Sequence, residues 1–335
     1  MSIITAIWST NELLRSYCRA MSTTCHKQPR LAMLLLLGCV SVGGNDGKAG
    51  DYKQLALVAT KATSQHTQPT SALSDNFEAR TIDPTKWWMR QARHGHYWIE
   101  PRMSRVAKKS IAIGVDGLMR GCGQSCQRNE IREAPKHQIK FGEEAWYSFS
   151  FRLAGATSTS RWVSGQWKQQ SGGSPFLAQR FNRGVYTITV QDDDCRVVVA
   201  SSDASVQNLP ATEQNTTDVA RVFPVAGAKT TCKTDIKVQY SANRVLPDPY
   251  RGWVDMNYRV RGGRNGKGLI EIWANGRFIA RVTGSIGDKV AAGPYQYFKF
   301  GIYRNFSPRP ATAYLDNYTR IRSMPATYTR RSSTL

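Results

Sequence analysis

Short runs in which apolar and polar residues alternate fill the chain from about residue 75 to residue 322. Alternation with a period of two is typical of β-strands with one buried face, because successive side chains point to opposite sides of a strand. Outside residues 1–38, no segment of useful length has the period of a helix. The runs that predict strands are residues 147–153, 186–192, 235–241, 253–262, 268–284, 295–303 and 312–322.

These strands predict an all-β fold, a sandwich or jelly roll of two packed antiparallel sheets. The Asn275-Gly276 dipeptide, between two alternating runs, predicts a tight hairpin. We expect one domain over residues 73–325, preceded by a linker over 39–72 that is rich in small and polar residues. Residues 326–335 read as a polar tail.

The first residues of the chain have the pattern of a secretory leader. An apolar run at residues 31–42 follows basic residues and is too short to span a membrane, which predicts a signal peptide over 1–38, with Met21 as an alternative start. Residues 36–39 resemble a lipoprotein cleavage box, so Cys39 is a candidate for a lipid anchor; a plain secretory cleavage site a few residues later is the alternative. A buried helix is the remaining interpretation. We expect a secreted, periplasmic or cell-envelope protein.

Cysteine usage agrees with export. Four of the seven cysteines lie beyond the leader and Cys39, and an even number in an exported chain favours two disulfides. Three pairings are open; the first two cysteines share one short glycine-rich loop, which favours pairing them with each other. A four-cysteine zinc site would need tighter spacing in the second pair. The four cysteines are Cys122, Cys126, Cys195 and Cys232.

The net charge of the chain indicates which classes of partner it is expected to bind. A formal net charge of +22 and a pI near 10.0 favour polyanions: nucleic acid, anionic lipid or acidic polysaccharide. The basic residues are scattered through the strands beside Trp and Tyr, without a recognisable nucleic-acid-binding motif, so nucleic acid is the weaker candidate. We expect a monomer with no cofactor. Residues 192–194, three aspartates, suggest calcium, but a polar turn is the preferred interpretation.

Four stretches place polar side chains together on one face of a strand. They are RNEIRE (128–133), GQWKQQ (165–170), SPFLAQRF (174–181) and YQYFKFGIY (295–303). Each alone has a structural explanation, such as an ion-pair ladder or a solvated sheet face. Together they predict a surface for an anionic sugar chain, because Tyr and Trp stack on sugar rings while Arg and Lys pair with carboxylates or sulfates.

Across these stretches the chain resembles the heparin lyase I-like polysaccharide lyases, which include glucuronan lyase; jelly-roll alginate lyases carry a similar trio of motifs. The resemblance covers about residues 75–322. It implies a concanavalin-like β-jelly roll, in which two antiparallel sheets pack together and form a concave substrate groove, and a β-elimination reaction. The matching residues are Arg128, Glu130 and Arg132, Gln166 and Trp167, Gly268, Ile270, Glu271, Trp273, Asn275 and Gly276, and residues 297–303.

The resemblance also implies roles for the residues. Tyr303 would be the acid that protonates the leaving oxygen, and also the base if the elimination is syn. Arg128 and Gln166 would hold the uronate carboxylate. Substrate binding is assigned to Arg132, Lys299, Tyr297, Glu130 and Arg180, with Lys299 as the electrostatic neighbour of Tyr303.

Lys168 departs from the family pattern, because relatives usually have a histidine at this position. A lysine can neutralise a carboxylate or, when desolvated, act as a base. His94, His96 or His137 are alternative sources of an imidazole, and a Tyr303 that makes both proton transfers would need none.

Two other functions remain open on the same residues. One is a non-catalytic protein that binds acidic polysaccharides; it would keep the basic side chains of the polar face but would not carry out the elimination. A glycoside hydrolase would need paired carboxylates. Glu130 and Glu133 fall on opposite faces of their strand, and each has an arginine within two positions, which disfavours a hydrolase.

Overall fold

The computed structural model describes residues 72–89, 95–118, 125–155, 161–170, 173–182, 184–203, 221–224, 233–289 and 293–322. The predicted leader, nearly all of the linker and the polar tail lie outside these residues, as do Met21 and Cys39. The predictions about export and lipidation therefore stay predictions.

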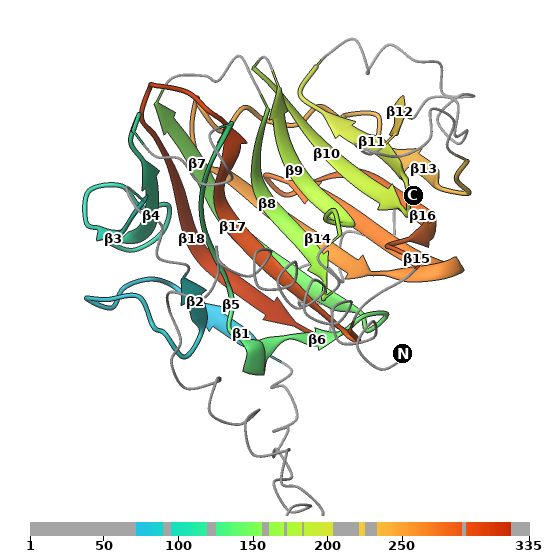
Figure 1. Ribbon diagram of the computed structural model, residues 1–335, viewed down its shortest axis with the longest axis horizontal. Coiled ribbons are helices and arrows are strands. Elements are labelled where there is room, and N and C mark those ends of the chain that lie inside the picture. Colours follow the sequence, from blue (N-terminus) through green and yellow to red (C-terminus); the bar gives the residue numbers. More distant parts are fainter. Residues whose placement is uncertain are drawn as a thin grey trace, which may run out of the picture. The chain divides into compact units, whose positions relative to one another are not determined.

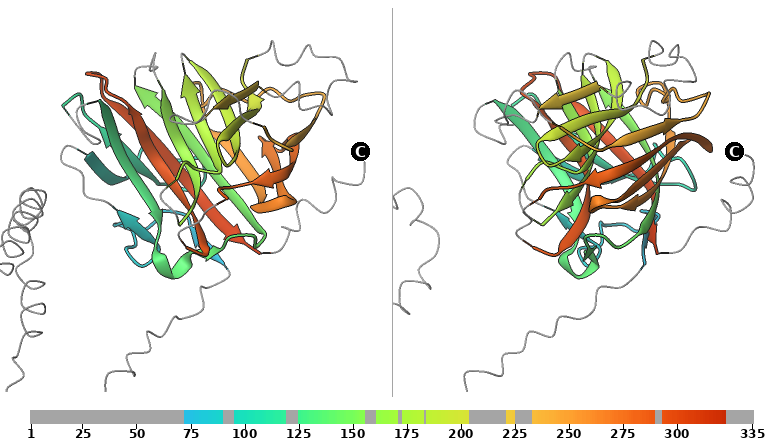
Figure 2. Two further views of the ribbon diagram at one scale, coloured as in Figure 1. Left: turned by 45° about the vertical axis from the view of Figure 1, so that its right-hand side comes forward. Right: turned by 90° about the vertical axis from the view of Figure 1, so that its right-hand side faces the viewer.

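Two antiparallel sheets form the domain and pack face to face (Figures 1 and 2). Sheet A has the order β13-β16-β15-β14-β7-β18-β4-β3, with β1 added on β18, and sheet B has the order β12-β11-β10-β9-β8-β17-β5-β2, with β6 added on β17. Among the described residues the one helical element is a short 3-10 turn, η1 (Pro135–His137). The predicted all-β jelly roll is confirmed.

The strands of sheet A are β13 (Lys237–Tyr240), β16 (Arg277–Ile286), β15 (Gly263–Ala274), β14 (Val254–Arg261), β7 (Ala145–Gly155), β18 (Ala311–Ile321), β4 (Ser110–Val115), β3 (Gly95–Glu100) and β1 (Leu73–Asp75). Those of sheet B are β12 (Arg221–Pro224), β11 (Cys195–Ser201), β10 (Val185–Asp192), β9 (Leu177–Asn182), β8 (Trp162–Gln169), β17 (Tyr295–Asn305), β5 (Cys126–Glu133), β2 (Trp87–Met89) and β6 (Ile139–Lys140).

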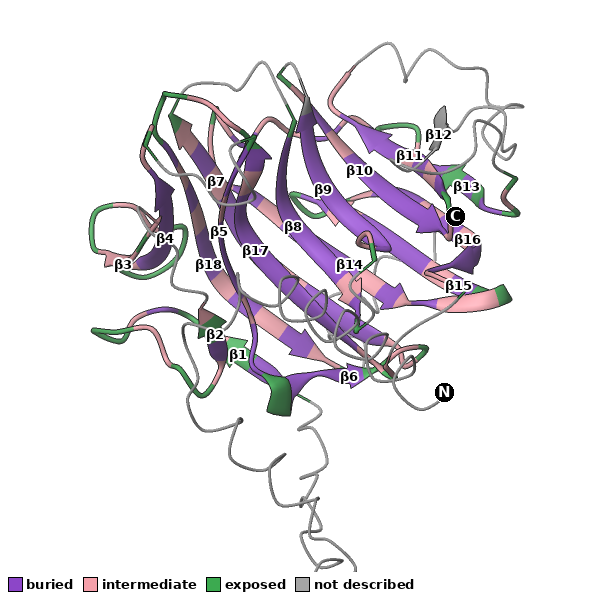
Figure 3. Ribbon diagram, viewed as in Figure 1, coloured by how far each residue is buried: buried purple, intermediate pink, exposed green. Residues whose placement is uncertain are grey.

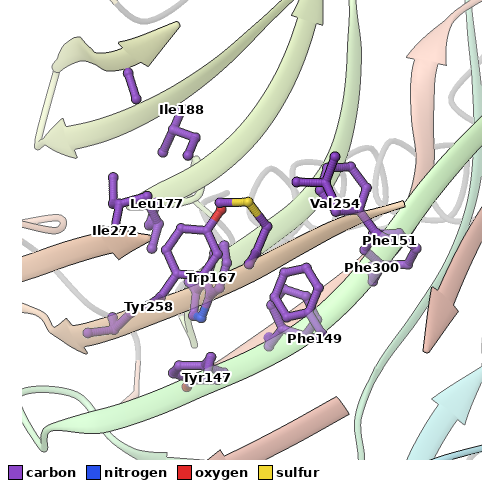
Figure 4. Close-up of a cluster of buried hydrophobic side chains, with 14 of the residues drawn as sticks. Tyr147, Phe149, Phe151, Trp167, Leu177, Ile188, Val254, Tyr258, Ile272 and Phe300 are labelled. Atoms are coloured by element: carbon purple, nitrogen blue, oxygen red, sulfur yellow. The ribbon is translucent and has the colours of Figure 1, made fainter. Parts of the chain in front are cut away.

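Aromatic side chains from both sheets fill the space between them. Trp167 of β8 lies with its ring centroid 4.6 Å from that of Tyr258 of β14 and 4.7 Å from that of Phe298 of β17. Figure 4 shows part of this cluster, in which Phe149 and Phe300 also lie. Buried residues run along the central strands of both sheets (Figure 3). The even-numbered residues of β17 therefore face the core, and its odd-numbered residues face the other way.

The predicted hairpin joins β15 to β16. Ala274 pairs with Arg277, so the turn consists of Asn275 and Gly276 alone. Both have positive φ, 49° and 74°, as a type I′ turn requires. An asparagine followed by a glycine adopts this conformation with little strain, which explains why the dipeptide was a reliable signal.

The cysteines lie at the ends of two strands of sheet B. Cys126 begins β5 and Cys195 begins β11; both are buried, and both are disulfide-bonded. Cys122 and Cys232 lie outside the described residues, so the predicted pairing stays a prediction.

Candidate functional site

Sheet B brings the four polar stretches side by side, in the strand order β9-β8-β17-β5. Strand β17 lies between β5 and β8, so Lys299 has Arg132 opposite on one side and Gln166 opposite on the other. In the same way Tyr303 lies opposite Arg128, and Tyr297 opposite Lys168. Residues directly opposite each other in a sheet project from the same face. We call this surface, the side of β5, β17 and β8 that faces away from the core, the outer face.

Glu130 is the centre of the polar contacts on the outer face. Its carboxylate accepts hydrogen bonds from Arg128 Nε at 2.5 Å, from Lys299 Nζ at 2.9 Å, and from the side-chain amide of Gln166. Burial by itself would raise the pKa of Glu130, but the charges of Lys299 and Arg128 outweigh it and the pKa is lowered. Glu130 is therefore an ionised anchor that fixes three predicted site residues.

Lys168 lies near the same group of charges and is half-buried. Burial, helped by the positive charges of Lys299 and Arg128, lowers its pKa to about 8. Burial also lowers the pKa of Lys299, although the contact with Glu130 opposes this effect. Near pH 8 a large fraction of Lys168 is therefore uncharged.

Tyr303 and Tyr297, two of the three tyrosines on the outer face, contact arginine side chains. The ring of Tyr303 contacts two guanidinium groups, with its centroid 4.8 Å from Arg128 Cζ and 4.7 Å from Arg161 Cζ. Lys299, predicted as the cationic neighbour of Tyr303, donates instead to Glu130. The ring of Tyr297 lies 5.3 Å from Arg132 Cζ. Such cation–π contacts fix ring orientation and hold positive charge next to the phenols.

A glycine allows the strands to meet under this site. Gly301 lies opposite Glu130 and has a φ of 145°; a Cβ atom there would lie 2.4 Å from the carbonyl oxygen of Asn129. Between Phe300 and Tyr303 the register of β17 against β8 shifts by one residue, which is a β-bulge. Bulges bend a strand and redirect the side chains that follow. Gly301 thus sets the direction in which Tyr303 projects.

Arg180, from the stretch at residues 174–181, lies two strands away from Tyr303. It is opposite Val163 of β8, and its Nε donates to Thr189 Oγ1 at 2.9 Å. Burial lowers the pKa of Arg180, and the positive charges of Arg196 and Arg161 add to this effect. Arg180 therefore belongs to a second group of basic residues rather than to the cluster around Glu130.

Sequence reasoning missed three residues next to the predicted ones. Trp88 of β2 is 43% exposed, and its ring centroid lies 4.1 Å from Arg132 Cζ. Arg161 and Arg196 lie near Tyr303 and Arg180. Alternation offered a weak signal for two of them, because Trp88 follows the buried Trp87 and Arg196 precedes the buried Val197.

The histidines considered as substitutes lie elsewhere. His96 is exposed on β3 of sheet A. His137 is buried in η1, where its Nε2 lies 3.1 Å from the carbonyl oxygen of Thr85, and burial lowers its pKa. His94 lies outside the described residues. The suggestion that His96 or His137 reaches the site is therefore wrong.

Two of the three aspartates considered for calcium pair with cations. Asp192 contacts Arg264 at 2.6 Å, and Asp193 contacts Lys289 at 3.0 Å. Within the described ranges, no group of three or more His, Cys, Asp or Glu residues is placed to hold a metal ion. The part of the chain that the structure describes also holds no helix long and apolar enough to cross a membrane.

Known proteins resemble this chain in sequence pattern and in fold. Solved structures with a related fold include an endo-β-1,4-glucuronan lyase from the fungus Trichoderma reesei (12% identity, TM-score 0.46, covering 70% of this chain and 89% of that one). The cellulose-induced protein Cip1 is 14% identical with a TM-score of 0.44, covering 75% of this chain and 97% of that one. The alginate lyase A1-II′ is 12% identical with a TM-score of 0.42, covering 70% of this chain and 94% of that one. No curated protein sequence matches the chain. A family model described as polysaccharide lyase matches residues 79–319, which is most of the chain, and the chain therefore belongs to the polysaccharide lyase family.

Proposed function

We propose that this polysaccharide lyase cleaves a uronate-containing polysaccharide by β-elimination on the outer face of β5, β17 and β8. The reaction needs a group that neutralises the uronate carboxylate, a base that removes the C5 proton, and an acid that protonates the departing O4. The observation that carries the proposal is the pairing of Lys168 with Tyr297 across β8 and β17, one pleat from the pairing of Gln166 with Lys299.

The residues around Glu130 suit the neutralisation of a carboxylate. Arg128 and Lys299 bring two positive charges to the single negative charge of Glu130, which leaves a net positive charge for a substrate. Arg128 uses Nε for Glu130, and a guanidinium group has further N–H donors in a geometry that matches a carboxylate. Arg128, Lys299 and Gln166 are therefore assigned to the uronate carboxylate, and Arg132 and Arg180 to substrate binding.

Lys168 suits the role of the base. An amine must be in its unprotonated, uncharged form to accept a proton, and an amine with a pKa of about 8 is about half uncharged at that pH. Neutralisation of the substrate carboxylate makes the C5 proton more acidic, so a moderately weak base is sufficient. In this assignment Lys168 takes over the proton transfer for which related lyases usually have a histidine.

Two phenols compete for the role of the acid. Tyr303 is the one that the resemblance implies. It lies six residues along β17 from Tyr297, the residue opposite Lys168, which is about 20 Å in an extended strand. At that distance Lys168 cannot serve as its base, so Tyr303 would have to act as base as well. Tyr297 lies directly opposite Lys168, so one sugar unit can meet both side chains. The register therefore favours Lys168 as base with Tyr297 as acid, and Tyr303 as sole acid and base is the competing proposal.

Phenylalanine variants separate the two proposals. We expect Tyr297→Phe to lower kcat by 10²- to 10⁴-fold, the usual contribution of a general acid, and Tyr303→Phe to keep kcat within about tenfold of wild type. Tyr295→Phe serves as the matched control, because Tyr295 is on the same strand but lies opposite Lys140 of β6. A large loss with Tyr303→Phe and none with Tyr297→Phe would reverse the assignment.

A substrate panel tests the reaction itself. Purified protein is incubated with glucuronan, alginate, heparin and heparan sulfate, and the ultraviolet absorbance of unsaturated uronate products is followed. We expect a rise on at least one polymer. Binding without any rise in absorbance would overturn the β-elimination proposal and favour the non-catalytic binding protein.

The position of the protein in the cell and its disulfides are part of the same proposal. We assign residues 1–38 to an export leader, with Cys39 as the lipidation candidate, and the pairs Cys122–Cys126 and Cys195–Cys232 to two disulfides. The buried, disulfide-bonded sulfurs of Cys126 and Cys195 support the second assignment. Mass spectrometry of the mature protein, intact and after non-reducing digestion, would find the cleaved N-terminus and the two linked peptides.

A further inference from the structure

A second group of basic side chains lies beside the proposed site. Arg180 of β9 is 9% exposed, and its Nε donates a hydrogen bond to the hydroxyl of Thr189, which is also buried. Arg196 lies on β11, two strands beyond β9 in sheet B, and Arg161 immediately precedes β8. The positive charges of Arg161 and Arg196 both act on Arg180, and that of Arg161 acts on Arg196. We call these three residues the arginine cluster.

The arginine cluster lacks negative charge. Among the residues that the structure describes, no carboxylate oxygen lies within 4.0 Å of any of the three guanidinium groups. Arg196 Nε is buried and has no hydrogen-bond partner in the same set of residues. Arginine does not lose its proton in proteins, so the three charges remain and repel one another. Arg180 is buried, whereas Arg196 is half-buried and Arg161 is exposed. A buried charge without an ionic partner is costly, so the position of Arg180 indicates that an anion completes the cluster.

Tyr303 connects the arginine cluster to the residues around Glu130. One face of its ring contacts Arg161 of the cluster, and Arg128, which bonds to Glu130, contacts the ring as well. A row of paired residues runs from Arg128 through Tyr303 and Val163 to Arg180. Adjacent strands are about 4.8 Å apart, so the backbone of Arg180 is about 10 Å from that of Tyr303. Both groups therefore lie on the same side of sheet B, close enough to contact one extended chain.

We infer that Arg161, Arg180 and Arg196 form a second anion subsite, which binds a carboxylate or sulfate group on a sugar unit near the one that is cleaved. This inference rests on the proposed function, because it names a further group that the substrate must carry. Carboxylates and sulfates present oxygen atoms in pairs, and guanidinium groups bind such pairs with two parallel N–H donors. The preferred substrate thus carries anionic groups on more than one sugar unit.

The test compares a double variant, which removes two charges of the arginine cluster, with a control variant that removes one charge elsewhere. Arg161→Gln/Arg196→Gln removes two charges but keeps Arg180 and its bond to Thr189, so the sheet is expected to fold normally. Arg251→Gln, in an exposed turn far along the sequence, is the charge-loss control; its side chain is 88% exposed. Kinetics are measured on unsulfated polyglucuronate, and binding is measured by calorimetry with unsulfated tetraglucuronate and with a carboxyl-reduced, sulfated tetrasaccharide that β-elimination cannot cleave.

We expect the double variant to raise KM for polyglucuronate, or Kd for the tetrasaccharide that occupies the subsite, by tenfold or more, and Arg251→Gln to change neither by more than about twofold. An effect on polyglucuronate and tetraglucuronate identifies a neighbouring carboxylate as the ligand. An effect confined to the sulfated probe identifies a sulfate ester.

The subsite is refuted if the double variant behaves like Arg251→Gln with every probe, or if wild type binds neither tetrasaccharide. Failure of the proposed function has a different signature: wild type cleaves no polymer, while the binding measurements still decide whether the arginine cluster takes an anion.

Discussion

At the scale of single residues, Lys168 determines how the site would work. Its amine lies among cations, and its burial lowers its pKa to about 8. The uncharged form can accept a proton, whereas the ammonium form can only neutralise a carboxylate. The two roles require opposite protonation states, so the pH dependence of the reaction distinguishes them.

If Lys168 is the base, kcat/KM should rise about tenfold per pH unit below pH 8 and level off above it, because only the uncharged amine of the free enzyme is active. Lys168→Met should remove this rise and lower kcat/KM by 10²- to 10⁴-fold, measured from pH 6 to pH 9.5. Lys237→Met, an exposed lysine of β13, should leave the profile unchanged. A kcat/KM that falls as the pH passes 8 would assign the ammonium form, and thus carboxylate neutralisation, to Lys168.

At the scale of elements, strand β17 had the most predictable local structure. Its alternation placed Phe298, Phe300 and Ile302 on the core face, and the structure buries all three completely. The same rule placed Tyr297 and Tyr303 together on the opposite face. Alternation cannot separate these two phenols, because the strands beside β17 decide which phenol has Lys168 as its neighbour.

The neighbours of β17 are remote in sequence. Strands β5 and β8 precede it by well over a hundred residues, and only the family resemblance indicated that their motifs meet. Strands of two or three residues, such as β2 and β6, are too short to show a period. Trp88 on β2 was missed because one buried neighbour, Trp87, is only a weak signal, and because its contact with Arg132 depends on β2 lying beside β5.

Gly301 shows how one residue controls this element. Alanine there would need a φ of 145° and would bring Cβ to 2.8 Å from the Cα of Glu130. We expect Gly301→Ala to lower the free energy of unfolding by roughly 1–3 kcal/mol and to reduce activity by moving β5 and Glu130. Urea denaturation and kinetics at one pH measure both effects.

Gly252→Ala is the control for this prediction. Among the described residues, and apart from its two chain neighbours, no atom lies within 4 Å of a Cβ built there. This substitution should change the free energy of unfolding by no more than about 0.5–1 kcal/mol. Equal effects of the two substitutions would mean that the close approach of β17 and β5 does not constrain the strand.

At the scale of the whole molecule, a buried ion pair links the two sheets. Glu133, at the end of β5 in sheet B, contacts Arg320 of β18 in sheet A at 2.9 Å, and both side chains are fully buried. The same carboxylate accepts hydrogen bonds from the hydroxyl of Tyr318 at 2.6 Å and from the backbone N–H of Phe298 at 3.0 Å. The pair thus connects β5, β17 and β18 through the core, directly behind the outer face.

Removal of the arginine alone should be costly, because it leaves the carboxylate of Glu133 buried without its charged partner. We expect Arg320→Met to lower the free energy of unfolding by about 3–5 kcal/mol in urea denaturation, and Glu133→Gln/Arg320→Met to cost less than this single substitution, since the double variant buries no charge. Arg322→Met, just beyond the end of the same strand, removes a partly exposed pair with Glu143 and should cost no more than about 1 kcal/mol. If Arg320→Met and Arg322→Met were equally mild, the link between the sheets would depend on the aromatic core, and the ion pair would contribute no more to stability than a surface contact.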